Sequence, residues 1–186
     1  MALVVERARR LFTIEEYHRM AETGILQPDD RVELIDGEIF EMSPIGSRHA
    51  ACVNNLNRIL VLGLGVRAVV SPQNPVQIPR YSEPEPDVAV LRARSYKTLA
   101  PVTEDVLLLV EVADTSLRFD RTVKLSLYAR AGIPEYWLAD ANAETVTIYR
   151  QAGNEMYTDV RIARIDDALS PLAFPDLMIR VADLFA

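Results

Sequence analysis

The most hydrophobic stretch of the chain covers residues 106–112, with sequence VLLLVEV, and Glu111 is its only charged position. A short, continuous apolar run of this kind is typical of a central strand that is covered on both faces of a sheet. Other runs rich in β-branched residues predict further strands, at 67–70, 76–78, 88–91, 135–140 and 145–149.

Helical spacing of apolar positions predicts the segments that would cover this sheet. Thr13 and Glu16 have the spacing of a capping box, and Gly24 is expected to end the helix that they begin. Ser47 is expected to cap a second helix. The helical segments are 13–24, 47–62, 121–131 and part of the 172–186 tail, which should also hold a last strand. Strands and helices alternate through a core at about 31–150, so we expect an α/β fold with a mixed sheet.

A hairpin is predicted where RVELI and EIFEM flank Asp36-Gly37. An Asp-Gly pair accepts the positive φ angles of a tight two-residue turn. Pairing outward from this turn places Ile35 opposite Glu38 and Glu33 opposite Phe40. Glu33 then shares a face with apolar side chains, which is costly for a carboxylate unless a partner compensates its charge.

Three acids stand in unusually apolar surroundings: Glu33 in the hairpin, Asp87 directly before the strand VAVL, and Glu111 in the central strand. Three converging carboxylates repel one another unless a divalent cation lies between them. Oxygen ligands with room for water suit Mg²⁺ or Mn²⁺ better than zinc. The alternative is that each acid is solvated or ion-paired, with Arg31 or Arg118 as partner, and spacing alone does not show that the acids meet.

Length and composition limit the class of protein. The 186 residues suit one domain, 1–186, and the apolar fraction of 49% and charged fraction of 25% are those of ordinary globular proteins. The single cysteine, Cys52, excludes a disulfide framework within the chain and a cysteine-rich zinc site. No run approaches the ~20 apolar residues of a membrane span, and MALVVERARRLF lacks the order of a signal peptide, so we expect a cytoplasmic protein.

Several motifs occur in one order along the chain: VELIDGEIFEMSP, then His49, PEPDVAV, LLVEVADTS and DRTVKLSLYARAGIPEYWLAD. Through these motifs, and over about Phe12 to Phe185, the sequence resembles the Uma2 family of bacterial proteins. That family is described as endonucleases of the PD-(D/E)XK, or restriction-endonuclease-like, class. The resemblance implies a restriction-endonuclease-like core, with a mixed central β-sheet flanked by helices.

The resemblance also implies roles for particular residues. Asp87 corresponds to the aspartate of the PD motif, Glu111 to the second acid, and Glu33 to an early acid that assists the metal. Ala113 occupies the place of the usual lysine, and Lys124 on the next helix matches the position to which the family has moved it. The metal set would then be Asp87, Glu111, the Val112 carbonyl and Glu33.

Two further residues are accessory candidates. His49 is expected in the first turn of its helix. Two interpretations remain for its side chain: it reaches the site, or it has a structural role at the helix terminus. Tyr128 lies four residues after Lys124 and shares its helix face. The loop 113–116, Ala-Asp-Thr-Ser, departs from the Ser-Pro-Ser type frequent in the family, which affects the expected loop contacts with substrate and leaves the acids unchanged.

The expected function is therefore a Mg²⁺- or Mn²⁺-dependent endonuclease acting on nucleic acid, with DNA expected over RNA, and acting as a homodimer. The net charge of −7 argues against strong binding of phosphate backbones. Two alternatives remain at this level: a nuclease-fold binding module without catalysis, and a hydrolase of smaller phosphate esters.

Overall fold

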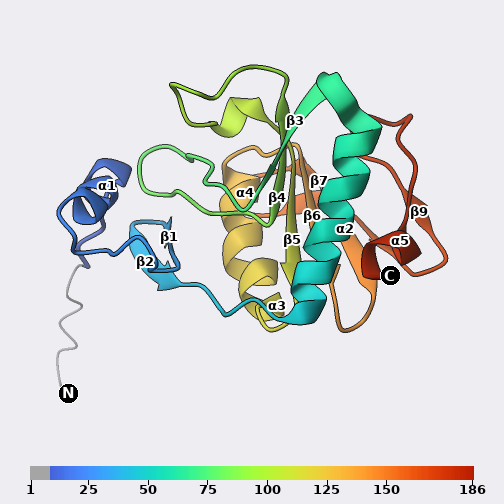
Figure 1. The fold of residues 1–186 in the computed structure, drawn as a ribbon, viewed down its shortest axis with the longest axis horizontal. Coiled ribbons are helices and arrows are strands. Elements are labelled where there is room, and N and C mark those ends of the chain that lie inside the picture. The colour runs from blue at the N-terminus through green and yellow to red at the C-terminus, as the bar shows by residue number, and fades with distance from the viewer. Residues whose placement is uncertain (1–8) are drawn as a thin grey trace.

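A six-stranded mixed sheet forms the centre of the computed structural model, which describes residues 9–186 (Figure 1). The strand order is β3-β4-β5-β6-β7-β8, and all neighbours are antiparallel except the parallel pair β5 and β6. The strands are β3 (Ala68–Pro72), β4 (Val88–Arg92), β5 (Val106–Ala113), β6 (Glu135–Asp140), β7 (Thr145–Ala152) and β8 (Tyr157–Ala163). The α/β fold with a mixed central sheet and flanking helices is confirmed.

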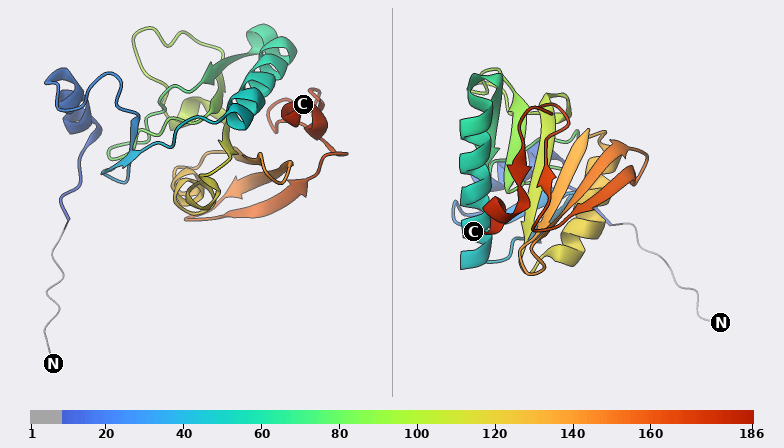
Figure 2. Two further views of the ribbon diagram at one scale, coloured as in Figure 1. Left: turned by 60° about the horizontal axis from the view of Figure 1, so that its bottom comes forward. Right: turned by 90° about the vertical axis from the view of Figure 1, so that its right-hand side faces the viewer.

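Helices cover both faces of this sheet. One face packs against α2 (Ser47–Leu64) and α5 (Val181–Phe185), and the other packs against the helical segment between β5 and β6 (Figure 2). That segment consists of α3 (Leu117–Phe119), a π-helical turn η3 (Asp120–Lys124) and α4 (Leu125–Arg130). β5 is buried on both faces, as its apolar sequence predicted, and Glu111 is its single charged residue.

Alternation along β5 decides which layer each side chain joins. Val110 and Val112 pack in the layer beneath α2, whereas Leu109 and Ala113 pack in the layer beneath α4. Successive side chains of a strand point to opposite faces. Glu111 therefore projects into the α4 layer, among apolar neighbours.

The N-terminal part consists of α1 (Ile14–Glu22) and a hairpin of β1 (Val32–Ile35) and β2 (Glu38–Glu41). The capping box of Thr13 and Glu16 is present. The register predicted from the turn is confirmed, since Glu33 lies opposite Phe40 and Ile35 opposite Glu38. Hydrogen bonds from Gly37 N–H to the Tyr81 carbonyl (2.7 Å) and from Glu83 N–H to the Leu34 carbonyl (2.7 Å) attach the hairpin to the rest of the fold.

Some predicted elements were wrong. The α2 helix has Gly46 as its N-cap, without a side-chain cap, so Ser47 is its first helical residue. No strand forms at 76–78, where Gln77 and Ile78 make only isolated bridges with single residues of loops. The helix predicted to begin at Arg121 begins at Leu117 and contains the π-helical turn. β8 was not predicted, because its central residues are exposed and give no apolar run.

The C-terminal tail folds as predicted, into a strand and a short helix. β9 (Ala168–Leu169) pairs with β10 (Ile179–Arg180), and α5 follows directly. Two 3-10 turns, η1 (Gly65–Arg67) and η2 (Thr103–Asp105), complete the elements of the described residues. Within residues 9–186, no helix has the length and apolar character that crossing a membrane requires. Most of the N-terminal segment considered for a signal peptide lies outside the described residues.

Candidate active site

A pocket of about 750 Å³ opens between the β1–β2 hairpin, the start of α2, the end of β5 and the α3–α4 segment. Seven carboxylates line it, against three residues with a permanent positive charge, Arg31, Arg118 and Lys124. The carboxylates belong to Glu33, Glu41, Glu85, Asp87, Glu111, Asp114 and Asp120. This excess of negative charge distinguishes the pocket from an ordinary hydrophobic cavity.

Glu111 lies at the floor of the pocket with 3% of its surface exposed. Its Oε1 atom accepts two hydrogen bonds, from Lys124 Nζ at 3.0 Å and from the Tyr128 hydroxyl at 2.7 Å. Lys124 and Tyr128, which the sequence places on one helix face, therefore both contact Glu111. Arg31 and Arg118, the partners considered from sequence, do not form this ion pair.

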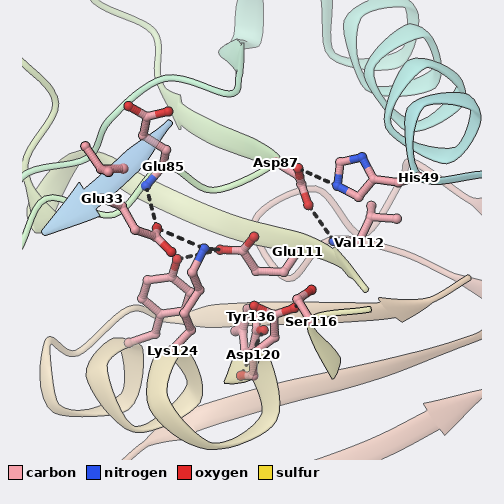
Figure 3. A network of polar contacts seen from close by, with 12 residues as sticks. Glu33, His49, Glu85, Asp87, Glu111, Val112, Ser116, Asp120, Lys124 and Tyr136 are labelled. Atoms are coloured by element: carbon pink, nitrogen blue, oxygen red, sulfur yellow. Dashed lines mark hydrogen bonds and ion pairs between the residues drawn. The ribbon is translucent and has the colours of Figure 1, made fainter. Parts of the chain in front are cut away.

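Lys124 joins two acids that are far apart in sequence. Its Nζ lies 3.0 Å from Glu111 and 3.1 Å from Oε2 of Glu33, which also accepts a hydrogen bond from the Glu85 N–H at 3.2 Å (Figure 3). Lys124 is the last residue of the π-helical turn, a local widening that often occurs at functional sites. The turn and the hairpin register together place one ammonium group between two buried carboxylates.

The charges of this cluster are strongly coupled. Burial raises the pKa of Glu111 well above its ordinary range, although the Lys124 ammonium opposes the effect and the Asp120 carboxylate adds to it. Burial alone would lower the pKa of Lys124, but the carboxylates of Glu111 and Glu33 outweigh it and raise the pKa. Lys124 is therefore charged at neutral pH, and its ammonium group forms ion pairs with both Glu111 and Glu33.

Asp87 approaches the site from the neighbouring strand. It directly precedes β4, in which Val88 pairs with Val110, one residue before Glu111. Its Oδ2 accepts a hydrogen bond from the Val112 N–H at 2.8 Å, and its Oδ1 lies 2.9 Å from Nε2 of His49. The carboxylate of Asp87 is thus fixed by β5 on one side and by α2 on the other.

His49 lies in the first turn of α2 and lines the pocket, as one of its two sequence interpretations proposed. Its hydrogen bond with Asp87 raises the pKa of the imidazole, against the opposing effect of burial. Its Nδ1 atom is buried and has no hydrogen-bond partner among the described residues. The Val112 N–H contacts Asp87, and the Tyr128 hydroxyl contacts Glu111. Neither Val112 nor Tyr128 lines the pocket.

Four of the seven acids that line the pocket were not predicted from the sequence: Glu41, Glu85, Asp114 and Asp120. Asp120 is buried and accepts a hydrogen bond from the Ser116 hydroxyl at 2.5 Å. Its position four residues before Lys124 on a helix face was a signal that could have identified it. Burial raises the pKa of Glu85, and the neighbouring Glu33 carboxylate raises it further. Glu85 belongs to the PEPEPD segment, where only Asp87 was singled out.

The donor chemistry of the pocket fits a hard divalent cation. Carboxylate oxygens are the ligands that Mg²⁺ prefers, and this ion commonly uses one or two of them together with water. Asp87 and Glu111 line the same pocket from adjacent strands. Within residues 9–186, no three His, Cys, Asp or Glu side chains group closely enough to ligate one ion. A bound cation would therefore have few protein ligands.

Comparisons with known proteins identify the fold and the family of the chain. No curated protein sequence matches the chain. Among solved structures, a nuclease-fold protein described as a "putative nuclease belonging to DUF820", from Anabaena variabilis, is similar with a TM-score of 0.74 and 16% sequence identity. The match covers 94% of this chain and 97% of that chain, and at this identity it shows the shared fold. A sequence profile described as "Putative restriction endonuclease" matches residues 14–182. The chain belongs to the Uma2 family.

Proposed function

We propose that this protein is a metal-dependent endonuclease that hydrolyses phosphodiester bonds of nucleic acid, with DNA as the expected substrate. The observation that carries the proposal is the buried Lys124, held between Glu33 and Glu111 at the floor of an acid-rich pocket. Membership of a family described as restriction endonucleases supports the same reaction class.

In this proposal Asp87 and Glu111, which line the pocket, hold Mg²⁺ or Mn²⁺, whereas the Val112 carbonyl that the family resemblance implied is not part of the lining. When bound, such an ion polarises a phosphoryl oxygen and acidifies water. Lys124 supplies a fixed positive charge where negative charge develops on the reacting phosphate. A preorganised charge in a buried site needs no reorganisation at the moment of reaction, which is why it is effective there.

The remaining polar residues position these groups. Tyr128 fixes the Glu111 carboxylate through its hydrogen bond to Oε1, and Glu33 holds the Lys124 ammonium from the opposite side. His49 and the Val112 N–H fix the two oxygens of Asp87. Each of these contacts restricts a rotamer, and restriction of this kind keeps reacting groups within productive distance.

The net charge of −7 requires that substrate affinity come from local cations. Arg31 and Arg118 line the pocket, and both are exposed. They are available to phosphates that flank the scissile bond, and a bound divalent ion would offset part of the carboxylate charge. We therefore expect weak binding with a shallow dependence on salt concentration, because few phosphates are neutralised.

A smaller phosphate ester is the second candidate substrate. Glu111 and Lys124 have only 3% and 5% of their surface exposed, and a compact ester reaches a recessed floor more easily than a rigid duplex does. A single-stranded or locally opened nucleic acid meets the same steric requirement.

A substrate panel tests the proposal. Purified protein is incubated with plasmid DNA, single- and double-stranded DNA, RNA and bis(4-nitrophenyl) phosphate, each with Mg²⁺, Mn²⁺ or a chelator. We expect nucleic-acid cleavage that requires metal, that Asp87→Asn abolishes, and that Asp29→Asn at an exposed loop position leaves unchanged. Folded protein that cleaves only the small ester supports the second candidate, and protein inactive on every substrate contradicts catalysis.

A further inference from the structure

Strand β8 forms an open edge of the central sheet. It pairs only with β7 and lies at one end of the sheet (Figure 2). Residues 158–162 are all exposed. Val160 and Ile162 are 52% and 57% exposed, which is unusual for apolar residues in a strand. An exposed strand edge presents unpaired backbone groups, and proteins normally protect such an edge unless another strand pairs with it.

The polar residues of β8 are arranged with opposite charges two positions apart. Asp159 and Arg161 alternate with Thr158, Val160 and Ile162, so the charged and β-branched side chains lie on opposite faces. Neither Asp159 nor Arg161 forms an ion pair within the part of the chain that the structure describes.

We propose that β8 pairs in antiparallel orientation with β8 of a second copy of this chain, in a twofold arrangement centred on Val160. In that register Asp159 of each copy lies opposite Arg161 of the other. Opposite charges facing each other across antiparallel strands stabilise the pair, whereas like charges destabilise it. The two six-stranded sheets then form one continuous sheet.

The same register matches the other face of the strand. Val160 faces its own counterpart, and Ile162 faces Thr158, so every cross-strand pair on this face is β-branched. Because a twofold interface places one surface patch against itself, the patch must be complementary to its own reversed copy. The segment 158–162 meets this requirement in both charge and shape, which favours a second copy over an unrelated strand.

Neighbouring residues extend the contact. Asp159 and Arg161 border a hollow of about 320 Å³ that Leu172 and Met178 also line, and these two apolar residues are 51% and 75% exposed. Stable interfaces bury about 1,000 Å² or more, and a short strand pair alone buries less. We therefore expect a weak dimer, with a dissociation constant on the order of micromolar.

This interface is independent of the candidate active site. β6 and β7 lie between β8 and the Glu111-bearing β5. The pocket is lined by none of the β8 residues, so both pockets of a dimer stay open. Success or failure of this proposal therefore does not depend on catalysis.

Charge reversal tests the register. Sedimentation velocity over a range of concentrations measures the dimer dissociation constant of the full chain. Arg161→Asp places two pairs of like charges opposite each other, as does Asp159→Arg, and each should raise the dissociation constant roughly tenfold or more. The double variant Asp159→Arg with Arg161→Asp restores opposite charges and should restore wild-type association. Arg58→Asp, at an exposed position of α2, is the matched control and should have no effect.

Circular dichroism confirms that each variant is folded, which is expected because both residues are exposed. A wild-type protein that stays monomeric at concentrations on the order of 1 mM overturns the proposal. A dimer that survives both single reversals, or that the double variant fails to restore, places the interface elsewhere and equally overturns it.

Discussion

Two buried carboxylates on adjacent strands, Glu111 on β5 and Glu135 on β6, differ in how their charge is satisfied. Glu135 is fully buried, and its oxygens accept hydrogen bonds from Trp137 Nε1 at 2.9 Å, the Leu172 N–H at 2.6 Å and Arg150 Nε at 2.7 Å. The Glu135 carboxylate therefore forms an ion pair with one guanidinium group, that of Arg150, in direct contact.

Glu111 is satisfied differently. It shares one ammonium group with Glu33, and only its Oε1 atom accepts hydrogen bonds among the described residues. It also faces a pocket with four more carboxylates than permanent cations. Burial alone therefore does not separate the proposed functional acid from a structural one. A shared cation and an open, acid-rich side distinguish Glu111 from Glu135, which is part of the packing.

The largest expected effect is on catalysis. Glu111→Gln keeps the size of the side chain but removes the charge that the proposal requires, so turnover should fall about 10³-fold or more. Glu135→Gln should retain turnover close to wild type, provided that the protein is folded. Initial cleavage rates at saturating Mg²⁺ measure both. Equal losses in the two variants would mean that the distinction between the two acids is wrong.

Removal of the Glu135 carboxylate should have the largest effect on the free energy of unfolding. Glu135→Ala leaves the Arg150 guanidinium and two N–H donors without their acceptor, so the free energy of unfolding should decrease by about 3 kcal/mol. Urea denaturation measures this difference. A decrease below about 1 kcal/mol would show that water replaces the carboxylate easily and that this cluster contributes little.

Variants that lack Lys124 and variants that lack Arg150 should differ in how added metal changes their stability. Lys124→Met leaves Glu33 and Glu111 buried without a positive charge, and should lower turnover about 10²-fold and lower the melting temperature in chelator. Added Mg²⁺ should recover part of that melting temperature, because the ion supplies positive charge at the same place. Arg150→Met is the matched control, and Mg²⁺ should not rescue it. Rescue of both variants, or of neither, contradicts a cation site beside Lys124.

The smallest effect concerns a single hydroxyl group. Tyr128→Phe removes the hydrogen bond to Glu111 and should cost about 1 kcal/mol of stability and up to about tenfold in turnover. Tyr157→Phe removes a comparable bond, from another buried tyrosine to the Ile133 carbonyl at 3.0 Å, and should affect stability alone. Thermal denaturation and cleavage rates of the pair separate positioning of Glu111 from simple packing. A normal rate in Tyr128→Phe would remove its positioning role.

Local sequence rules predicted much of this region. The Asp36-Gly37 turn fixed the register that turns Glu33 inward, and the apolar run of β5 identified Glu111. Helical spacing placed Lys124 and Tyr128 on one face. These features depend on neighbours within a few positions, so they can be predicted from a single sequence.

Long-range features could not be predicted in the same way. The bond between Asp87 and His49 depends on how α2 packs over the sheet, and the shared use of Lys124 depends on where the hairpin attaches. The exposed edge of β8 depends on the strand order, which spacing along the chain does not specify. The assignment of catalytic and metal-binding roles stays a prediction.

A crystal structure with Mn²⁺ tests the central claim most directly, because the anomalous signal of the ion locates it without assumptions about activity. We predict an anomalous peak within coordination distance of the Asp87 and Glu111 carboxylates, and loss of that peak in Asp87→Asn. Absence of a peak in this pocket at saturating Mn²⁺, or a peak bound only to carboxylates elsewhere on the molecule, would contradict it.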